Sequence, residues 1–221
     1  MEDPCIQIIK LKDNYLNCSI KNVDVSIINS LRRIMISEVP SIAFEYIIVE
    51  SNDSNMPDEM LSHRLGLIPI SIPDQTINNL MLPVDCACEF ECPICTVKFD
   101  CHVSCPIGGG ESLIVASNHL IPDNNWNIQQ FVAVEYKIEE KSYPVPILLL
   151  RAGEKLRFKA IAKLGTGKQH AKWSPVSIAT FYQEDDNIIF LLESNGIFRS
   201  IDIFRKSISL LINKLKDVYI K

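Results

Sequence analysis

The sequence lacks the features that mark membrane, secreted and nucleic-acid-binding proteins. No apolar run approaches the roughly 20 residues that a membrane-spanning helix requires, and the first four residues have neither the basic nor the apolar character of a signal peptide. The formal net charge of −5 creates no overall field that would attract a phosphate backbone. We therefore expect an intracellular protein that neither crosses a membrane nor binds nucleic acid sequence-specifically by itself.

Common enzyme motifs are missing as well. The four histidines are scattered singly, and no Gly-x-Ser-x-Gly elbow is present. Gly165-Thr-Gly-Lys168 resembles a phosphate-binding loop only superficially, because Ala162 and Gln169 stand where that loop needs a glycine and a Ser or Thr. We expect a non-catalytic chain, and the basic segment 163–173 is either a contact patch or a solvated turn.

What is present suffices for a folded core, since 47% of the 221 residues are hydrophobic. Leu16, Cys18 and Ile20 alternate with polar residues, which is typical of a strand with one buried face. Asp24 is then placed to cap a helix over 25–38, whose apolar residues recur at three- and four-residue spacing until a proline ends it.

Weaker patterns predict the remaining elements. A short helix over 58–65 is expected to stop at Gly66, and the Cys-, Pro- and Gly-rich stretch 85–110 is expected to be a loop held by a ligand. Further strands are predicted over 43–50, 132–137, 147–150, 156–162 and 188–192.

The C-terminal helix is predicted to begin at a cap residue, Asp202, and to carry an apolar seam. The seam steps by four, three, four and three residues through Phe204, Ile208, Leu211, Leu215 and Val218. Further apolar residues beside the seam exceed what one neighbouring element would cover. By periodicity alone, the helix is either enclosed in its own core or offers one side to a partner.

Cysteines are concentrated in one short segment. Six of the eight fall within twenty residues, at Cys86, Cys88, Cys92, Cys95, Cys101 and Cys105. Four thiolates satisfy tetrahedral Zn(II), and a fully occupied set leaves no open position for a substrate. The polar character of the segment argues against buried free thiols. We therefore predict one structural zinc per chain, held by the first four cysteines in a loop over 86–95.

The identity of the metal stays open from the residues alone. Thiolate sets also hold iron–sulfur clusters, and Cys101, His102 and Cys105 are alternative ligands. We favour zinc bound by the first four cysteines and interpret the later pair as structural thiols.

Several of these segments together resemble a known family. Asn29-Ser-Leu-Arg-Arg-Ile-Met-Ile-Ser-Glu-Val-Pro40, His63-Arg-Leu-Gly-Leu-Ile-Pro69, the four cysteines and His170-Ala-Lys-Trp-Ser-Pro175 occur in the order found in the alpha-like third subunits of eukaryotic RNA polymerase II. The resemblance covers nearly the whole chain. The Leu-Arg-Arg helix is shared with the archaeal alpha-like subunits and with bacterial alpha subunits, whereas the cysteine set favours polymerase II.

The resemblance implies an α+β fold with a discontinuous alpha-like dimerisation domain, formed by 1–40 and 170–221 from a sheet and two helices. An inserted, mostly β domain over 41–169 would carry the zinc loop. The implied function is a non-catalytic assembly subunit that heterodimerises with the small alpha-like subunit. This pair would form the platform for the second-largest subunit and two small zinc-binding subunits, in the nucleus, or in the cytoplasm if the source is viral or archaeal.

The resemblance also assigns individual residues. Dimer-interface positions are Ile28, Leu31, Ile34, Met35, Phe204, Ile208, Leu211 and Leu215. Arg32 and Arg33 would contact a large subunit, because planar guanidinium groups suit bidentate interface contacts; the alternative is a solvated helix face. The segments 63–69 and 170–175 are expected near the same large-subunit surface.

Two other functions compete with this hypothesis. One is an alpha-like subunit of the archaeal type with an iron–sulfur cluster, and the other is a free-standing zinc protein. The sequence also departs from the family, because the stretch between Trp173 and the predicted strand at 188 is short and the chain stops soon after its last helix. Contacts that relatives make through longer segments are therefore in doubt.

Overall fold

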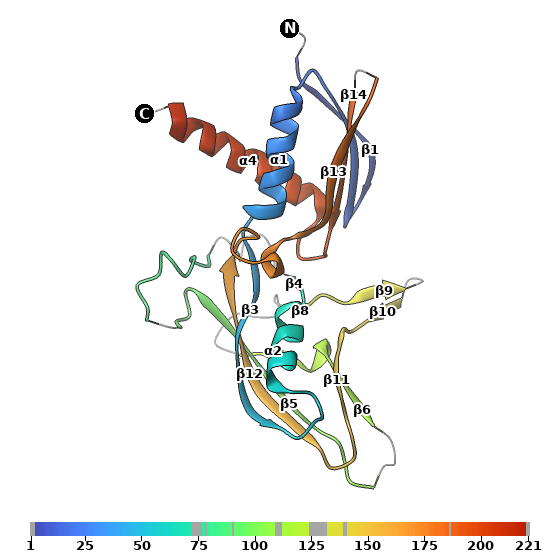
Figure 1. The fold of residues 1–221 in the computed structure, drawn as a ribbon, viewed down its shortest axis with the longest axis vertical. Coiled ribbons are helices and arrows are strands. Elements are labelled where there is room, and N and C mark those ends of the chain that lie inside the picture. The colour runs from blue at the N-terminus through green and yellow to red at the C-terminus, as the bar shows by residue number, and fades with distance from the viewer. Residues whose placement is uncertain are drawn as a thin grey trace. The chain divides into compact units, whose positions relative to one another are not determined.

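The computed structural model describes residues 3–71, 77, 79–89, 91–108, 112–123, 132–138, 141–185 and 187–219. The chain forms two compact units (Figure 1). Unit 1 combines the two ends of the chain, Met1–Ser41 and Gly165–Lys221, and unit 2 is the intervening Ile42–Leu164. No helix among the described residues is long and apolar enough to span a membrane.

Unit 1 is built on a four-stranded antiparallel sheet with the strand order β1-β2-β14-β13. Its strands are β1 (Cys5–Lys12), β2 (Tyr15–Lys21), β13 (Val176–Glu184) and β14 (Asn187–Ser194). The N-terminal and C-terminal hairpins join where β2 pairs with β14, which places Cys18 opposite Phe190. Hence residues from both ends of the chain share one sheet and one core.

Two helices pack on this sheet, α1 (Val25–Ser37) and α4 (Ser200–Tyr219). The Asp24 carboxylate accepts a hydrogen bond from the Ser26 backbone N–H at 2.8 Å, which is the predicted N-cap. Phe204 of α4 meets Phe190 edge-to-face, with ring centroids 5.9 Å apart. Figure 1 shows α4 crossing α1, with its C-terminal half extending past the other elements of unit 1.

The Gly-containing segment that follows β12 (Lys155–Gly165) packs against the end of α1. The Lys168 backbone N–H donates to the Ser37 carbonyl at 2.9 Å. A Cβ atom on Gly167 would overlap the carbonyl oxygen of Ile36, and one on Gly165 would overlap the Trp173 indole. The two glycines therefore allow close packing at the C-terminal end of α1.

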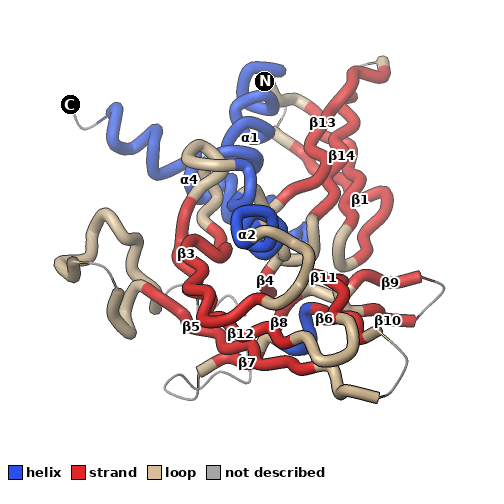
Figure 2. Tube along the Cα trace, turned by 60° about the horizontal axis from the view of Figure 1, so that its bottom comes forward, coloured by secondary structure: helices blue, strands red, loops and turns tan. Residues whose placement is uncertain are grey.

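Unit 2 is mostly β-structure, as the tube in Figure 2 shows. Its main sheet has the order β3-β12-β5-β7, formed by β3 (Ser41–Asn52), β12 (Lys155–Gly165), β5 (Thr96–Ser104) and β7 (Ile121–Pro122). Three two-stranded sheets pair β4 (Ile70–Ser71) with β8 (Val132–Ala133), β6 (Leu113–Ala116) with β11 (Pro146–Leu150), and β9 (Tyr136–Ile138) with β10 (Lys141–Tyr143). The helix α2 spans Asp58–Gly66, and short 3-10 turns span Ser117–His119 in unit 2 and Ala171–Trp173 in unit 1.

The core of unit 2 lies on one face of the main sheet. Phe44 of β3 and Phe99 of β5 are both buried and meet edge-to-face, with centroids 5.1 Å apart. From Phe99 to the end of β5, and over residues 155–160 of β12, buried residues alternate with exposed ones, so that Phe158 and Cys101 point inward. The rest of β12, residues 161–165, is buried throughout. The mixed α+β class is confirmed.

Three predictions about local structure were wrong. The stretch 85–110 is not one loop, because β5 begins at Thr96 and its alternating side chains fill the core. The predicted strand 132–137 is divided into two short strands. Asp202 does not cap α4, which begins at Ser200; its carboxylate instead pairs with Arg199 at 2.7 Å and Arg205 at 3.7 Å.

Candidate metal centre and helix surface

Four thiols of unit 2 converge on one point. The sulfur atoms of Cys86, Cys88, Cys92 and Cys95 all lie within 4.8 Å of one another. Sulfur–sulfur distances are 3.4 Å for Cys86–Cys88 and Cys88–Cys95, and 3.5 Å for Cys86–Cys92 and Cys92–Cys95. Among the described residues this is the only such cluster of metal-binding side chains.

These distances suit a single tetrahedral ion. Four sulfurs at a metal–sulfur distance of about 2.3 Å lie about 3.8 Å from one another. Small side-chain shifts would therefore bring all four cysteines to that geometry. In a four-iron cluster each thiolate binds a different iron atom, so the sulfurs would have to lie farther apart. The donor set thus fits one ion with four thiolates and no open position.

The second pair of cysteines is held by a tight turn that leads into β5. The Cys92 carbonyl accepts hydrogen bonds from the backbone N–H of Cys95 at 3.2 Å and of Thr96 at 3.0 Å. The Thr96 hydroxyl donates to the same carbonyl at 2.8 Å. Nearby, Lys98 of β5 forms an ion pair with Glu91 at 2.7 Å. The turn is therefore fixed to the main sheet.

The electrostatic surroundings of the four thiols differ. The pKa of Cys92 is lowered to about 7, mainly because the backbone N–H of Ile94 favours the thiolate form. Hydrogen bonding with Cys86, ahead of that with Cys95, raises the pKa of Cys88 to about 12. Sulfurs packed this closely share protons until a cation replaces them, and a bound cation would favour the thiolate form at all four positions.

The alternative ligands lie apart from this cluster. Cys101 and His102 are consecutive residues of β5, so their side chains point to opposite faces; Cys101 is buried and His102 is exposed. Burial raises the pKa of the Cys101 thiol to about 12. Cys105, just after the strand, is also buried. Cys101 belongs to the core as a small apolar side chain.

In unit 1, α4 presents an exposed apolar strip near its C-terminal end. The exposed residues are Ile212, Leu215, Val218 and Tyr219, with fractional exposures of 46%, 60%, 75% and 93%. The apolar seam predicted from the sequence is therefore buried at the start of the helix and exposed toward its end. Phe204 is buried, Ile208 and Leu211 are half-buried, and Leu215 is exposed. Such a strip on one helix marks a surface that is suited to another protein.

The predicted interface residues of α1 lie in the core of their own unit. Ile28, Leu31, Ile34 and Met35 are all buried there. Little of their surface is left for a partner, whereas Val25 and Ile27 on the same helix are each 46% exposed. Sequence periodicity identifies the apolar positions of a helix, but it does not show which neighbour covers each one.

The two arginines of α1 differ in environment. Arg32 is half-buried, and its Nε donates to the Asn29 side chain at 3.1 Å. Arg33 is exposed and lines a groove of about 210 Å³ between α1 and α4, together with Leu211. The groove is bridged by an ion pair of 2.6 Å between Lys214 and Glu38.

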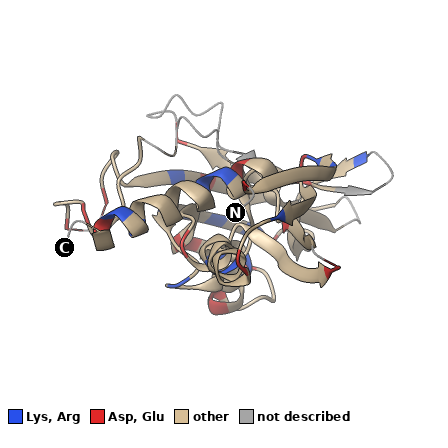
Figure 3. Ribbon diagram, turned by 90° about the horizontal axis from the view of Figure 1, so that it is seen from above, with Lys and Arg blue, Asp and Glu red and all other residues tan. Residues whose placement is uncertain are grey.

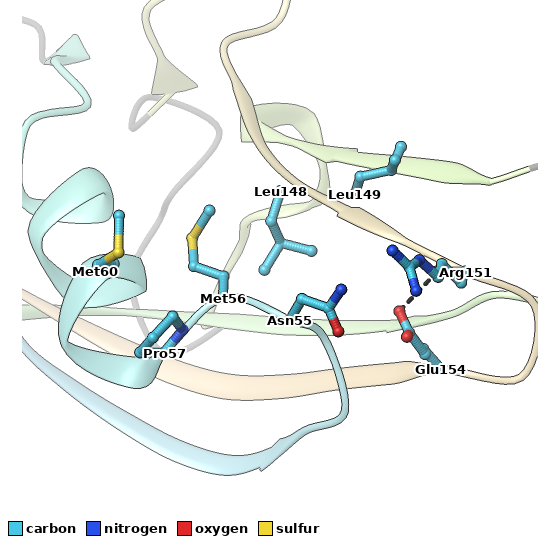
Figure 4. Close-up of a pocket in the computed structure, with 8 residues that line it drawn as sticks. All are labelled: Asn55, Met56, Pro57, Met60, Leu148, Leu149, Arg151 and Glu154. Carbon is cyan, nitrogen blue, oxygen red and sulfur yellow. Dashed lines mark hydrogen bonds between the residues drawn. The ribbon is translucent and has the colours of Figure 1, made fainter.

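A second groove, of about 340 Å³, lies in unit 2 (Figure 4). It is lined by Asn55, Met56, Pro57, Met60, Leu148, Leu149, Arg151 and Glu154. In Figure 4 Met56, Pro57 and Met60 lie toward α2, and Arg151 and Glu154 lie at the other end. There the Glu154 carboxylate accepts from the Arg151 backbone N–H at 2.7 Å. Flexible methionines and leucines suit a protein contact.

Charge is evenly distributed over the described parts of both units. Figure 3 shows acidic and basic residues interspersed, and both signs occur along α4. The sequence segments 63–69 and 170–175 belong to different units, the first to unit 2 and the second to unit 1. His170 is exposed, and its Nδ1 accepts from the Lys172 backbone N–H at 3.1 Å.

These features define an α+β protein with a helix-and-sheet unit assembled from both ends of the chain, and an inserted unit that holds four clustered thiols. The chain belongs to the RNA polymerase Rpb3/Rpb11 dimerisation domain family, whose model matches residues 17–215. The resemblance noted in the sequence is thereby confirmed.

Individual relatives come from eukaryotes and archaea. The chain is 35% identical over 194 residues to DNA-directed RNA polymerase II subunit rpb3 of Dictyostelium discoideum, covering 88% of this chain and 61% of the relative. It is 37% identical over 191 residues to subunit 3 of RNA polymerases II, IV and V of Arabidopsis thaliana, covering 84% and 59%. It is 38% identical over 154 residues to RNA polymerase subunit Rpo3 of Methanosphaera stadtmanae, covering 70% and 52%. The chain thus spans about three fifths of the length of the eukaryotic relatives.

Proposed function

We propose that this chain is a non-catalytic assembly subunit of RNA polymerase II and that it heterodimerises with the small alpha-like subunit. The observation that carries the proposal is the match of residues 17–215 to a dimerisation family, combined with the exposed apolar strip on α4. A strip of this kind loses unfavourable contact with water when a partner covers it.

The proposed dimer surface combines α1 and α4 of unit 1. Its exposed apolar residues are Val25, Ile27, Ile212, Leu215, Val218 and Tyr219. The buried residues of α1 and Phe204 support this surface from below, because they fix both helices on the sheet. Leu211 lines the groove between the helices. A helix of the partner would bury the strip on α4.

We further propose that the heterodimer is a platform for the second-largest subunit and two small zinc-binding subunits. Arg33 supports this role because its guanidinium group is exposed and suits a carboxylate of a neighbouring subunit. Arg32, about 100° further around the helix axis, would contribute from an adjacent face of α1. The Met- and Leu-lined groove of unit 2 offers a second contact surface. In a eukaryotic cell the chain would act in the nucleus.

The proposed metal is a structural zinc ion bound by Cys86, Cys88, Cys92 and Cys95. When bound, zinc would cross-link two turns of a segment that has little regular structure of its own. The four thiols occupy every position of a tetrahedron, so the centre would have no place for a substrate. The role is therefore to stabilise unit 2 rather than to carry out chemistry.

An alpha-like subunit of the archaeal type, with an iron–sulfur cluster, is the second candidate, and the relationship to archaeal Rpo3 proteins favours it. Metal analysis separates the two candidates. About one zinc per chain without acid-labile sulfide supports the polymerase II type, and iron with sulfide supports the archaeal type. A free-standing zinc enzyme would show an exchangeable water on the cobalt-substituted protein, whereas four thiolate ligands would exclude it.

Co-expression tests the heterodimer directly. The full chain should be poorly soluble or aggregated alone, and it should become monodisperse as a 1:1 complex when the small alpha-like subunit of the same organism is co-expressed. Light scattering coupled to gel filtration gives the stoichiometry. A chain that is stable and monodisperse alone, with no complex on addition of the partner, would contradict the proposal.

A further inference from the structure

The two halves of the candidate metal centre are held very differently. Cys92 and Cys95 lie in a turn that runs directly into β5, and Cys95 is only 1% exposed. The Cys92 carbonyl accepts hydrogen bonds from the backbone N–H groups of Cys95 and Thr96. By contrast, residues 86–89 make no backbone-to-backbone hydrogen bond to any other described residue. One half is therefore built into the sheet, and the other is a segment with few restraints.

Thr96 connects the ordered half to the sheet. Its side chain is 1% exposed, and its hydroxyl donates to the Cys92 carbonyl at 2.8 Å. Its own backbone N–H donates to the same carbonyl at 3.0 Å. As the first residue of β5 it is paired with Lys163 of β12. The orientation of the Cys92–Cys95 turn is thus transmitted from the main sheet through one buried residue.

We propose that Thr96 is a positioning residue that preorganises Cys92 and Cys95 as the fixed half of the metal centre, onto which Cys86 and Cys88 close. The inference rests on the proposed zinc role and adds a division of labour within the site. Groups that orient metal ligands through hydrogen bonds commonly change metal affinity by 10- to 100-fold when they are removed. Thr96 would act in this way through the backbone of a ligand residue, because its hydroxyl donates to the Cys92 carbonyl and so fixes the turn that carries the Cys92 and Cys95 sulfurs.

The first test replaces Thr96 in the full chain. Thr96→Val keeps the shape and the β-branching but removes the hydroxyl donor, and the Cys92 carbonyl retains two backbone donors. We expect zinc affinity, measured by competition with a chromogenic chelator, to fall by about 10-fold or more. Thr96→Ser restores the hydroxyl and should bind zinc within about 3-fold of the parent chain. Thr180→Val, on an exposed position of β13 in unit 1, is the matched control and should not change affinity.

The second test reads the two halves separately. Backbone amide hydrogen exchange of the metal-free chain is followed by mass spectrometry, because this measurement does not depend on the thiolate fraction of each cysteine. The amides of residues 86–89 should exchange several-fold faster than those of Cys95 and Thr96, and Thr96→Val should remove most of this difference. General loosening of unit 2 would also accelerate exchange at Cys101 in the middle of β5, which should stay slow in both proteins if the effect is local.

The outcomes separate this inference from the proposed function. If the parent chain binds no zinc, the metal role fails and the inference fails with it. If the parent chain binds zinc but Thr96→Val binds it equally well, or if the amides of 86–89 exchange as slowly as those of Cys95 and Thr96, the inference alone is overturned. A loss of affinity in Thr96→Val that Thr96→Ser does not rescue would also overturn it, because the hydroxyl would not be the cause.

Discussion

Replacing Leu215 by aspartate probes the proposed dimer surface at its most informative position. Leu215 is 60% exposed in the isolated chain, so the substitution removes few contacts within unit 1. Covering the exposed part of a leucine is worth roughly 1–2 kcal/mol. Burying a carboxylate in the same apolar contact costs about 2 kcal/mol or more in addition. The heterodimer should therefore weaken by at least about 3 kcal/mol, which corresponds to more than about 100-fold in Kd.

The assay is a titration of the co-purified small subunit by calorimetry or light scattering. Thermal unfolding of the chain, kept soluble by fusion to a carrier protein, should show a change in stability within about 0.5 kcal/mol, as expected for an exposed site. Leu211 is less suitable because it is half-buried in the groove beside α1, so that Leu211→Asp would also disturb the chain itself.

Asn213→Asp is the matched control for Leu215→Asp. Asn213 is exposed and lies about 160° around the helix axis from Leu215. The Asn213→Asp substitution adds the same charge near the same helix end as Leu215→Asp, so both variants carry the same unfavourable interaction with the helix dipole. Affinity should remain within about 3-fold of the parent chain. Equal affinity of Leu215→Asp and Asn213→Asp would remove the C-terminal half of α4 from the interface and refute the reasoning.

Three further results follow from the structure. Cys92→Ser should abolish zinc binding and lower the stability of unit 2, while partner binding by unit 1 is retained. In the native chain at pH 8 an alkylating reagent should modify the exposed Cys5 but spare Cys18 and Cys101, whose pKa values burial raises to about 11 and 12. Gly167→Ala should destabilise unit 1 by about 1–3 kcal/mol, because the added methyl group overlaps the backbone of α1.

Each of these has its own control and contradicting outcome. For Cys92→Ser, loss of the partner in a pull-down would show that the two units do not act separately. Burial raises the pKa values of the Cys18 and Cys101 thiols above the ordinary value of 9.0. The stability that these protonated thiols contribute is therefore fully present below pH 9.0 and is lost as the pH rises through about 11 and about 12. Modification of Cys18 in folded protein at pH 8 would contradict its burial. For Gly167→Ala, the neighbouring Lys168→Ala keeps its backbone hydrogen bond to Ser37 and should be nearly neutral.

The sequence predicted those elements whose periodicity matches their burial. In α1 the cap Asp24 and the repeating apolar residues agree, so the helix was found to within one residue at its C-terminal end. β1 was missed because all of its residues are exposed and its apolar residues do not alternate cleanly with polar ones. β13 was missed for a related reason, since its mostly exposed residues at one edge of the sheet show no strong pattern. Strands at an edge are stabilised by pairing, which the local sequence does not record.

The candidate site was predictable to different depths. The spacing of the first four cysteines predicted the set that the fold brings together. The roles of Cys101 and Thr96 could not be read from composition, because they depend on the start of β5 and on which face of that strand is buried. The spacing of the apolar residues correctly identified α1 and α4 as amphipathic helices. Which of them are buried within unit 1 and which are exposed depends on the helix crossing and the sheet.

Unit 1 is the part of this chain through which we propose that it assembles with RNA polymerase subunits. The most direct measurement is to purify a tagged copy from its native cells and to determine the identity and stoichiometry of the proteins that remain bound. We predict one copy of the small alpha-like subunit per chain, with the second-largest subunit and the small zinc-binding subunits, and loss of the small alpha-like subunit from Leu215→Asp but not from Asn213→Asp. Recovery of the chain alone, or with no polymerase subunit, would contradict the claim.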